Sequence, residues 1–336
     1  MSSIHDLIAK LCPSGVCFKR LGDVARIKNG KDHKTLADGK YPVYGSGGIM
    51  RYANSYAYDK PSVLIPRKGS LDNLFFVDTP FWNVDTIFYT EIDEAQIYPK
   101  FFYYFLQTVG LGEMNQAGGV PSQTQSVLNE IKIPVPPIQI QAEIVRILDA
   151  MTAHTAELTA ELTARKKQYN YYRDKLLSFE DGEVEWKELG EICRFINGRA
   201  YKQPELLDSG KYPVLRVGNF FTNGNWYYSD LELDPDKYCD KGDLLYAWSA
   251  SFGPRIWEGE KVIYHYHIWK ILPDLNLVSK KYLYYLLAWD TEALKAESGT
   301  GSTMMHIGKG SIEKRLVPIP SLQKQARIVS LLDKFD

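Results

Sequence analysis

The stretch that decides the fold is IPVPPIQIQAEIVRILD, residues 133–149, because the chain repeats it as VPIPSLQKQARIVSLLD at residues 317–333. When Asp149 is aligned with Asp333, the second copy has identical residues at the positions of Pro134, Pro136, Gln139, Gln141, Ala142, Ile144, Val145 and Leu148. A long repeat within one chain is the signature of a duplicated architecture. The two halves are therefore expected to share one plan.

Shorter repeats occur in the same order upstream of these two blocks. FKRLGDVARIKNGK at residues 18–31 resembles EWKELGEICRFINGRA at residues 185–200, GKYPV occurs at residues 39–43 and 210–214, and KFFYYFL at residues 100–106 matches KYLYYLL at residues 281–287. Between these repeats, residues 44–99 and 215–280 do not align. A shared frame with divergent interiors is typical of two recognition modules; a duplicated domain that drifted without functional meaning is the alternative.

Within each module, short runs of β-forming residues stand between Gly, Asn, Asp and Pro, and helical runs follow them. The expected strands are SVLIPRK, NLFFVD, DTIFYTEI, DLLYAWSA and HIWKIL, and the expected helices are PKFFYYFLQTVG and SKKYLYYLLAWDTEALKA. This order predicts an α+β fold in which each module has a twisted antiparallel sheet with helices.

A long helix is predicted between the modules, because residues 144–176 contain no Gly or Pro. Apolar and aromatic residues recur there with heptad spacing, at Ile144, Leu148, Met151, Leu158, Leu162, Tyr169, Tyr172 and Leu176. Such a seam is typical of a coiled coil and needs a partner helix. A helix over residues 139–179 would be about 60 Å long at 1.5 Å per residue. The expected domains are residues 1–137, the central helix 138–180, residues 181–320, and the start of a distal helix, 321–336.

Composition limits the class of protein. The 336 residues are enough for about two domains. A formal net charge of −1, from 40 basic and 41 acidic residues, counts against nonspecific attraction to nucleic acid but leaves room for local basic patches. Cys12, Cys17, Cys193 and Cys239 form no CxxC motif, so reduced thiols in a cytoplasmic protein are expected. No signal peptide or membrane-spanning run is recognised.

Several long motifs resemble the specificity (S) subunit of type I restriction–modification systems. They are LCPSGVCFKRLGDV at residues 11–24, VEWKELGEI at residues 184–192, RKKQYNYYRDKLLSF at residues 165–179, and the paired P…Q.QA.IV..LD blocks. The likeness extends over essentially the whole chain. It implies two target-recognition domains that each read one half of a bipartite, asymmetric site in double-stranded DNA, joined by helices that form an antiparallel coiled coil.

The resemblance also implies partners. Two methyltransferase (M) subunits, which carry S-adenosylmethionine and methylate adenine, would dock on the chain, and restriction (R) subunits that use ATP and Mg would join the larger complex. The chain itself would bind no cofactor. In the family the distal helix continues further, whereas this sequence stops at Asp336. Either the sequence is truncated, or a second copy or another chain supplies the missing helix.

Base readout needs Arg, Lys, Asn, Gln, Ser or Thr at base edges, with further cations on phosphates. In the first module the candidates are Lys28, Lys31, His33, Lys34, Ser46, Arg51, Tyr52, Arg67 and Lys68. In the second module they are Arg199, Lys202, Arg216, Asn219, Asn225, Trp226, Tyr227, Trp248, Ser249, Ser251 and Arg255. For each, a solvated surface loop is the alternative, and Trp248 could equally belong to the core. The loops 116–125 and 297–306 would close the modules and suit phosphate contacts.

No catalytic constellation emerges. The Asn/Asp-Pro-Pro-Tyr/Phe motif of adenine methyltransferases is missing from the sequence, and the leading interpretation is a non-catalytic DNA-specificity subunit. HYH at residues 265–267 puts two His on one predicted strand face, but no third ligand has an obvious place, so no metal site is expected. The competing hypothesis is an adaptor with two protein-binding domains on a coiled-coil rod, without DNA specificity.

Overall fold

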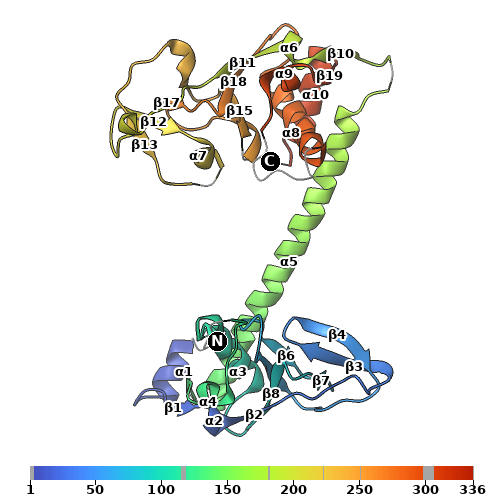
Figure 1. The fold of residues 1–336 in the computed structure, drawn as a ribbon, viewed down its shortest axis with the longest axis vertical. Coiled ribbons are helices and arrows are strands. Elements are labelled where there is room, and N and C mark those ends of the chain that lie inside the picture. The colour runs from blue at the N-terminus through green and yellow to red at the C-terminus, as the bar shows by residue number, and fades with distance from the viewer. Residues whose placement is uncertain are drawn as a thin grey trace. The chain divides into compact units, whose positions relative to one another are not determined.

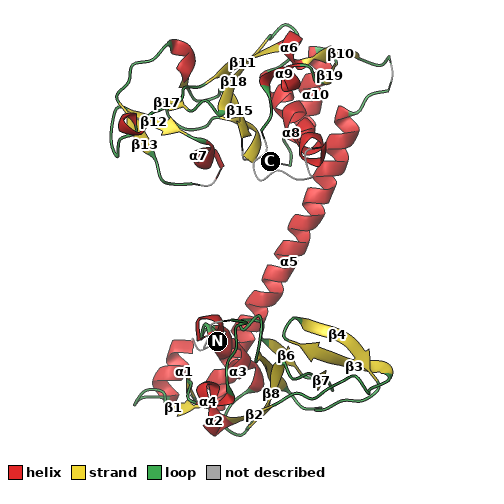
Figure 2. Cartoon of the chain, viewed as in Figure 1, coloured by secondary structure: helices red, strands yellow, loops and turns green. Residues whose placement is uncertain are grey.

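The computed structural model describes residues 4–114, 119–180, 182–221, 223–249, 251–297 and 306–335. The chain folds as two compact units, Met1–Thr159 and Ala160–Asp336. Each unit combines helices with small β-sheets, and the long helix α5 (Ile138–Leu177) begins in the first unit and ends in the second (Figures 1 and 2).

The first unit contains the elements that precede α5. In chain order they are α1 (Ile4–Leu11), β1 (Phe18–Arg20), α2 (Leu21–Val24), β2 (Ala25–Lys28), β3 (Asp38–Gly45), β4 (Gly48–Ala53), β5 (Ser62–Pro66), β6 (Phe75–Val77), β7 (Trp82–Asn83), β8 (Ile87–Ile92), α3 (Pro99–Gln107), η1 (Leu111–Met114), α4 (Gln125–Asn129) and β9 (Lys132–Pro134).

Three sheets organise this unit. Strands β2-β8-β5-β6 form an antiparallel sheet, β4-β3-β7 form a second sheet in which β3 and β7 run parallel, and β1 pairs with β9. Helix α3 packs on β5 and β6. The main core lies between that helix and the antiparallel sheet and includes Leu21, Val63, Phe88, Phe102 and Ile133, all nearly or fully buried.

The second unit repeats this order after α5. Its elements are β10 (Glu185–Glu188), α6 (Leu189–Ile192), β11 (Cys193–Asn197), η2 (Gln203–Glu205), β12 (Tyr212–Leu215), α7 (Val217–Phe221), β13 (Tyr227–Ser229), η3 (Pro235–Lys237), β14 (Tyr238–Cys239), β15 (Leu244–Ser249), β16 (Ser251–Ile256), β17 (Val262–Tyr264), β18 (Ile268–Pro273), α8 (Lys280–Glu297), α9 (Lys309–Glu313), β19 (Leu316–Ile319) and α10 (Leu322–Leu332).

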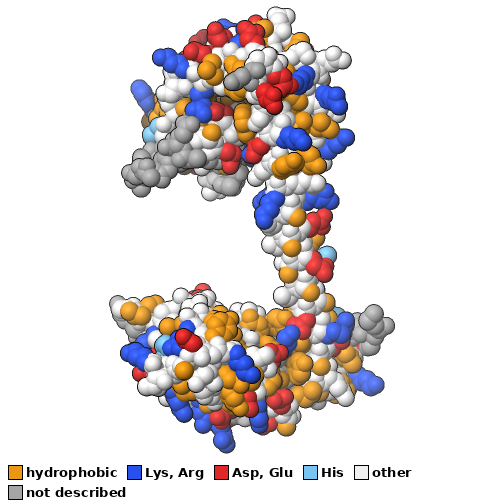
Figure 3. Space-filling model, turned by 90° about the vertical axis from the view of Figure 1, so that its right-hand side faces the viewer, with side chains coloured by type: hydrophobic (Ala, Val, Ile, Leu, Met, Phe, Trp, Pro, Cys, Tyr) orange, Lys and Arg blue, Asp and Glu red, His pale blue; other side chains and the backbone are white. Residues whose placement is uncertain are grey.

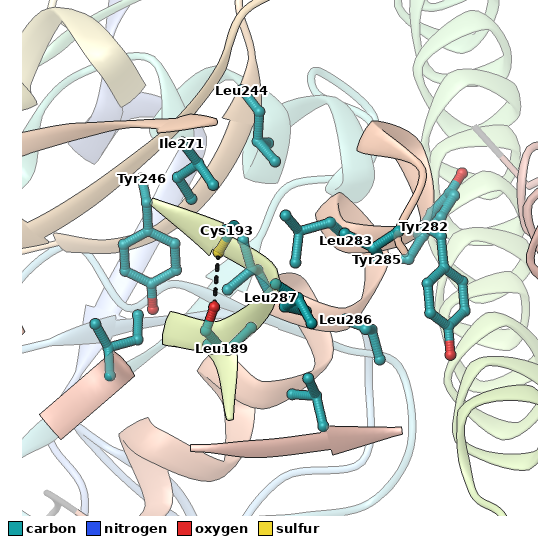
Figure 4. Packing of buried hydrophobic residues seen from close by; sticks show 14 of the residues in the cluster. Leu189, Cys193, Leu244, Tyr246, Ile271, Tyr282, Leu283, Tyr285, Leu286 and Leu287 are labelled. Carbon is teal, nitrogen blue, oxygen red and sulfur yellow. Dashed lines mark hydrogen bonds between the residues drawn. The ribbon is translucent and has the colours of Figure 1, made fainter. Parts of the chain in front are cut away.

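The sheets of the second unit match those of the first. Strands β11-β18-β15-β16 form an antiparallel sheet, β13-β12-β17-β14 form a sheet in which β12 and β17 run parallel, and β10 pairs with β19. The core includes Tyr282, Leu283 and Leu286 of α8, and Figure 4 shows Leu283 pointing toward the side of Leu244 and Ile271. The Cys193 thiol donates to the Leu189 carbonyl at 3.2 Å there.

The α+β fold, the duplication and the long helix between the modules are confirmed. The antiparallel sheet expected in each module is present, and each unit also contains one parallel strand pair in its other sheet. One expectation needs correction. The HYH residues do not share a strand face: β17 ends at Tyr264, and residues 265–267 form the turn into β18.

A buried glutamine fixes the start of α5 to the first unit. Gln141 is fully buried, and its side-chain oxygen accepts from the Tyr98 amide at 2.8 Å. Its side-chain nitrogen donates to the carbonyls of Gln96 at 3.0 Å and Pro136 at 2.7 Å. One amide side chain thus satisfies three main-chain groups just before α3 and α5, where helix ends leave polar groups unpaired.

Gln325 makes the same contacts at the start of α10. It accepts from the Ser279 amide at 2.9 Å and donates to the carbonyls of Leu277 at 2.8 Å and Pro320 at 2.9 Å. We call these two residues and their main-chain partners the glutamine clamps. Gln139 and Gln323 are also identical between the repeats, yet both are exposed.

A second pair of equivalent contacts lies two turns further along each helix. Asp149 accepts from Lys100 Nζ at 2.8 Å and the Tyr104 hydroxyl at 2.6 Å. Asp333 accepts from Lys281 Nζ at 2.8 Å and the Tyr285 hydroxyl at 2.6 Å. The repeated Lys-x-x-x-Tyr and terminal Asp of the sequence motifs therefore join α3 to α5 and α8 to α10.

The predicted heptad seam has three different environments along α5. Ile144 packs on the core of the first unit and Leu148 is half-buried, whereas Tyr169 and Leu176 pack on the core of the second. Met151, Leu158 and Leu162 are 61%, 53% and 55% exposed, and Tyr172 is also exposed although its ring lies 5.9 Å from Phe335. Figure 3 shows hydrophobic and charged side chains together on the middle of this helix.

We predict that Gln141→Leu destabilises the first unit by roughly 2–4 kcal/mol, because one buried amide and two carbonyls lose their partner while the side-chain volume is kept. Gln139→Leu, an equally repeated but exposed position, is the control and should change the free energy of unfolding by less than about 0.5 kcal/mol. Urea unfolding of both variants measures the difference. Equal effects would show that the clamp does not hold the helix.

Candidate nucleic-acid interface

One turn in the first unit collects main-chain hydrogen bonds from segments that are far apart in the sequence. Residues 83–86 link β7 to β8. The Lys31 amide donates to the Asn83 carbonyl at 2.9 Å, and the Val84 amide donates to the Tyr44 carbonyl at 2.9 Å. The Arg67 and Lys68 amides both donate to the Thr86 carbonyl, at 2.8 and 3.2 Å. The loop after β2, the end of β3 and the segment after β5 therefore meet at this turn.

The equivalent turn of the second unit, residues 264–267, is held in the same way. The Arg199 amide donates to the Tyr264 carbonyl at 3.0 Å, and the His265 amide donates to the Leu215 carbonyl at 2.9 Å. The Trp248 amide donates to the His267 carbonyl at 3.1 Å. We call residues 83–86 and 264–267 the hub turns, because three equivalent segments of each unit converge on them.

A repeated Asn-Gly explains how the first of these loops approaches its hub turn. A Cβ atom at Gly30 would lie 2.0 Å from the Val84 carbonyl oxygen, and one at Gly198 would lie 2.2 Å from the Tyr264 carbonyl oxygen. In both cases the added Cβ would clash with main-chain atoms, so no movement of a neighbouring side chain could relieve the clash. Glycine is required at both positions by close packing, and this accounts for the repeated NGK and NGR.

The two closing segments pair with corresponding turns, as their equivalence in the sequence predicts. The Gly69 amide donates to the Pro121 carbonyl at 2.9 Å, and Lys68 forms a bridge with Ser122. In the second unit, Ser249 forms a bridge with His306. Within the predicted phosphate-contacting loops, residues 116–118 and 298–305 lie outside the described residues.

Around the first hub turn the structure gathers four of the predicted residues: Lys31, Ser46, Arg67 and Lys68. The Ser46 amide donates to Thr86 Oγ1 at 3.4 Å. Lys31 and Lys68 are exposed, and no ion pair among the described residues involves either of them. These loops therefore present cations that are not neutralised by the protein.

The other candidates of the first unit do not join that group. Lys28 lies on β2 and pairs with Glu91 at 3.6 Å. Arg51 lies on β4 and pairs with Asp38 at 2.6 Å, next to the exposed Tyr52. His33 is partly buried and Lys34 exposed, both in the loop after the repeated Asn-Gly. Their role in DNA binding stays a prediction.

In the second unit, Arg199 and Trp248 bond to the hub turn, and Ser249 follows Trp248 at the end of β15. Arg199 is bound by Glu205 through two hydrogen bonds of 2.7 and 2.9 Å, and this guanidinium lowers the pKa of Glu205 to about 2. Ser249 is only 4% exposed. The Arg199 side chain is thus neutralised within the unit, and its contribution here is mainly the main-chain bond.

Most of the remaining candidates of the second unit form a separate aromatic and basic surface around α7. Arg216 lies 4.5 Å from the Tyr227 ring centroid, and Arg255 lies 5.6 Å from that of Phe220. Asn219 donates to the Asn225 carbonyl at 2.7 Å. Trp226 is partly buried and packs on the cluster that contains Phe220. Lys202 and Ser251 are exposed and lie elsewhere, Lys202 just before η2 and Ser251 opposite Ser249 in the β15–β16 hairpin.

Sequence reasoning missed an aromatic group at the second hub turn. The Trp248 ring stacks on Trp269 with centroids 5.5 Å apart, and its Nε1 donates to the Tyr266 carbonyl at 2.9 Å. His267 and His306 lie 4.9 and 5.9 Å from the Trp248 ring centroid. Trp248 is therefore both core-packed and part of a surface cluster.

Two histidines at this turn, His265 and His267, have a lowered pKa, which favours their uncharged form near neutral pH. Burial, followed by the neighbouring His267 and Arg216, lowers the pKa of His265 to about 4. Burial, followed by the neighbouring His306, also lowers the pKa of His267. The described residues hold no set of three or more His, Cys, Asp or Glu arranged to bind a metal ion. Neutral rings stack and hydrogen-bond, which suits contact with bases.

The type I restriction modification DNA specificity domain matches this chain twice, at residues 13–166 and 182–336. The chain belongs to this family. A putative type I restriction enzyme specificity subunit of Haemophilus influenzae is 31% identical over 96% of this chain and 88% of its own length. The EcoR124I/EcoR124II specificity subunit of Escherichia coli is 33% identical over 74% of this chain and 65% of its own length.

Solved structures of the family share the fold. The S subunit of a type I restriction–modification system from M. genitalium has a TM-score of 0.65 at 19% identity, covering 95% of this chain and 89% of that one. A chain from a structural study of type I complex assembly and conformational transition has a TM-score of 0.53 at 17% identity, covering 96% and 90%. The resemblance found in the repeats is confirmed.

In the described part of the chain, every helix is too short or too polar to cross a membrane.

We predict that Gly30→Ala and Gly198→Ala each destabilise their own unit by roughly 1–3 kcal/mol, because the added methyl group has to displace a main-chain carbonyl. Gly47→Ala is the control, since a Cβ atom there meets nothing within 4 Å. Thermal unfolding of the variants measures the effect. If Gly30→Ala behaved like Gly47→Ala, the close approach of the loop to the hub turn would be disproved.

Proposed function

We propose that this chain is the non-catalytic subunit that selects the DNA sequence in a type I restriction–modification complex, with each unit reading one half of a bipartite, asymmetric site. The observation that carries this proposal is the pair of hub turns. The same main-chain frame holds both, while the residues on them and on the converging loops differ. A constant frame with variable side chains suits two readers of different half-sites.

The chemistry at the hub turns supports contact with DNA. In the first unit, exposed Lys31 and Lys68 provide cations for phosphates, while Ser46 provides a hydroxyl for either a phosphate or a base. In the second unit, Trp248 and its neighbours provide planar and apolar groups. Because the net charge of the whole chain is only −1, affinity would come from these local groups and should fall steeply with salt.

The middle of α5 supports a second role, as spacer and docking site. Residues 151–168 are exposed throughout, including Met151, Leu158 and Leu162 of the heptad seam. An exposed apolar seam on a long helix is typical of a surface that a partner helix covers. We propose that M subunits carrying S-adenosylmethionine dock here, and that R subunits using ATP and Mg join them. We propose that a helix from a second copy or from another chain covers this seam. The complex would form in the cytoplasm.

The test is to express the chain with its M subunit and map methylated adenines across the genome. We predict one motif with two short half-sites and a constant spacer. Duplicating residues 155–161 keeps the heptad phase and lengthens α5 by about 10 Å, which corresponds to about three base pairs at 3.4 Å each. The spacer should therefore lengthen while both half-sites stay the same.

The control replaces residues 155–161 with a copy of residues 162–168, which changes the local sequence but not the length. It should leave the spacer unchanged. An unchanged spacer in the duplication variant would contradict the role of α5 in setting the separation. A complex with no bipartite motif and no salt-dependent DNA binding would contradict DNA reading and favour a protein-binding adaptor.

A further inference from the structure

We propose that the exposed residue at the centre of each hub turn, Asp85 in the first unit and Tyr266 in the second, contacts a base edge and selects one base pair of its half-site. This inference rests on the proposed DNA-reading function. Neither residue was among the candidates from the sequence, because the interiors of the two modules do not align there.

The hydrogen bonds place Asp85 and Tyr266 at equivalent positions. In both units the turn follows the strand that pairs in parallel, β7 or β17, and precedes β8 or β18. The first residue after that strand, Val84 or His265, accepts from the amide at the start of the next strand, Ile87 at 3.2 Å or Ile268 at 2.9 Å. Of the two residues between these anchors, the first, Asp85 or Tyr266, is exposed, and the second, Thr86 or His267, is partly buried.

The contacts shared by the two hub turns use main-chain atoms, so they do not depend on which side chain stands at the centre. Asn83 and Thr86 accept through their carbonyl oxygens, and Tyr264 and His267 do the same. The main chain therefore fixes where the central residue stands, while the residue type at that position can differ. A base-reading position needs this combination, because base readout requires a defined geometry and an exchangeable donor or acceptor.

The surroundings of Asp85 favour one kind of base. Its carboxylate lies in a turn bonded to the main chain of Arg67 and Lys68, and no cation among the described residues forms an ion pair with it. A carboxylate is repelled by phosphates, so it is tolerated against DNA where it accepts from an exocyclic amine. Asp and Glu are suited to accept from cytosine N4 in the major groove. We therefore assign Asp85 to a cytosine.

The surroundings of Tyr266 favour a different base. Tyr266 is 37% exposed, and its ring lies in the aromatic group, 3.9 Å from the His267 ring and 6.0 Å from the Trp248 ring between centroids. The described rings in contact with it come from tryptophan and histidine and carry no carboxylate, and burial lowers the pKa of His265 and His267. A ring edge exposed in this way suits apolar contact with the methyl group of thymine. We assign Tyr266 to a thymine.

The test uses the chain assembled with its M subunit and methylation mapping of both half-sites. Asp85→Ala should lower the preference for the cognate base pair at one position of one half-site by about 10- to 100-fold, since one base contact is lost. Asp85→Asn should shift the preference at that position towards adenine, because a carboxamide pairs with adenine N6 and N7. The other half-site should not change.

Tyr266→Ala should relax one position of the other half-site, and Tyr266→Phe should keep its preference, since the ring makes the contact. Glu94→Ala is the matched control: it removes an exposed carboxylate near the opposite end of β8 and should leave both half-sites as in the wild type. Unfolding temperatures of all variants identify any that fail to fold. For such a variant, the base preference is measured instead by its binding to a panel of oligonucleotides, at a temperature below its unfolding temperature.

The outcomes separate the two proposals. If the wild-type complex methylates a bipartite motif while the Asp85 and Tyr266 variants keep both half-sites unchanged, the base assignment is overturned and the proposed function stands. Folded variants that lose methylation uniformly, without relaxing any position, would also overturn it. If the wild-type complex has no bipartite motif, the proposed function itself fails.

Discussion

The buried side-chain amide of Gln141, and of Gln325 in the second unit, is the interaction on which the rest of the structure depends. Each one ties the first turn of a helix to the main chain just before another helix, using one acceptor and one donor group. A buried amide with all three partners fixes the direction in which the helix leaves the unit, because a shifted helix would leave main-chain groups unpaired. The contacts of Asp149 and Asp333 then hold the next two turns of α5 and α10 against α3 and α8.

The glutamine clamps and the contacts around them explain why certain residues are repeated in the sequence. The repeated residues lie at the glutamine clamps, at the Lys and Tyr that bind the terminal Asp, and at the glycines against the hub turns. Between these points the frame is held mainly by main-chain bonds, which leave the side chains free to differ. Two units can therefore keep one architecture while presenting an acidic turn in one case and an aromatic turn in the other.

The sequence was sufficient to predict the duplication, the α+β class and the long helix, because each of these leaves a pattern in side-chain identity. It could not predict the hub turns, because main-chain hydrogen bonds have almost no sequence signature beyond Gly30 and Gly198. The run of β-forming residues through His267 also concealed the end of β17 at Tyr264. The heptad seam was recognised, but its periodicity could not distinguish Ile144, which packs on a core, from Leu158, which is exposed.

The most direct test of the glutamine clamps is hydrogen exchange at the amides of Tyr98 and Ser279, which donate to the two glutamine side chains. If the clamps hold the helices as described, both amides exchange only when their own unit unfolds globally, with the free energy of that unfolding. The amide of Ala95, which donates to the exposed side chain of Asp93, should exchange much faster. Exchange of Tyr98 and Ser279 at the rate of Ala95 would contradict the central role of the clamps.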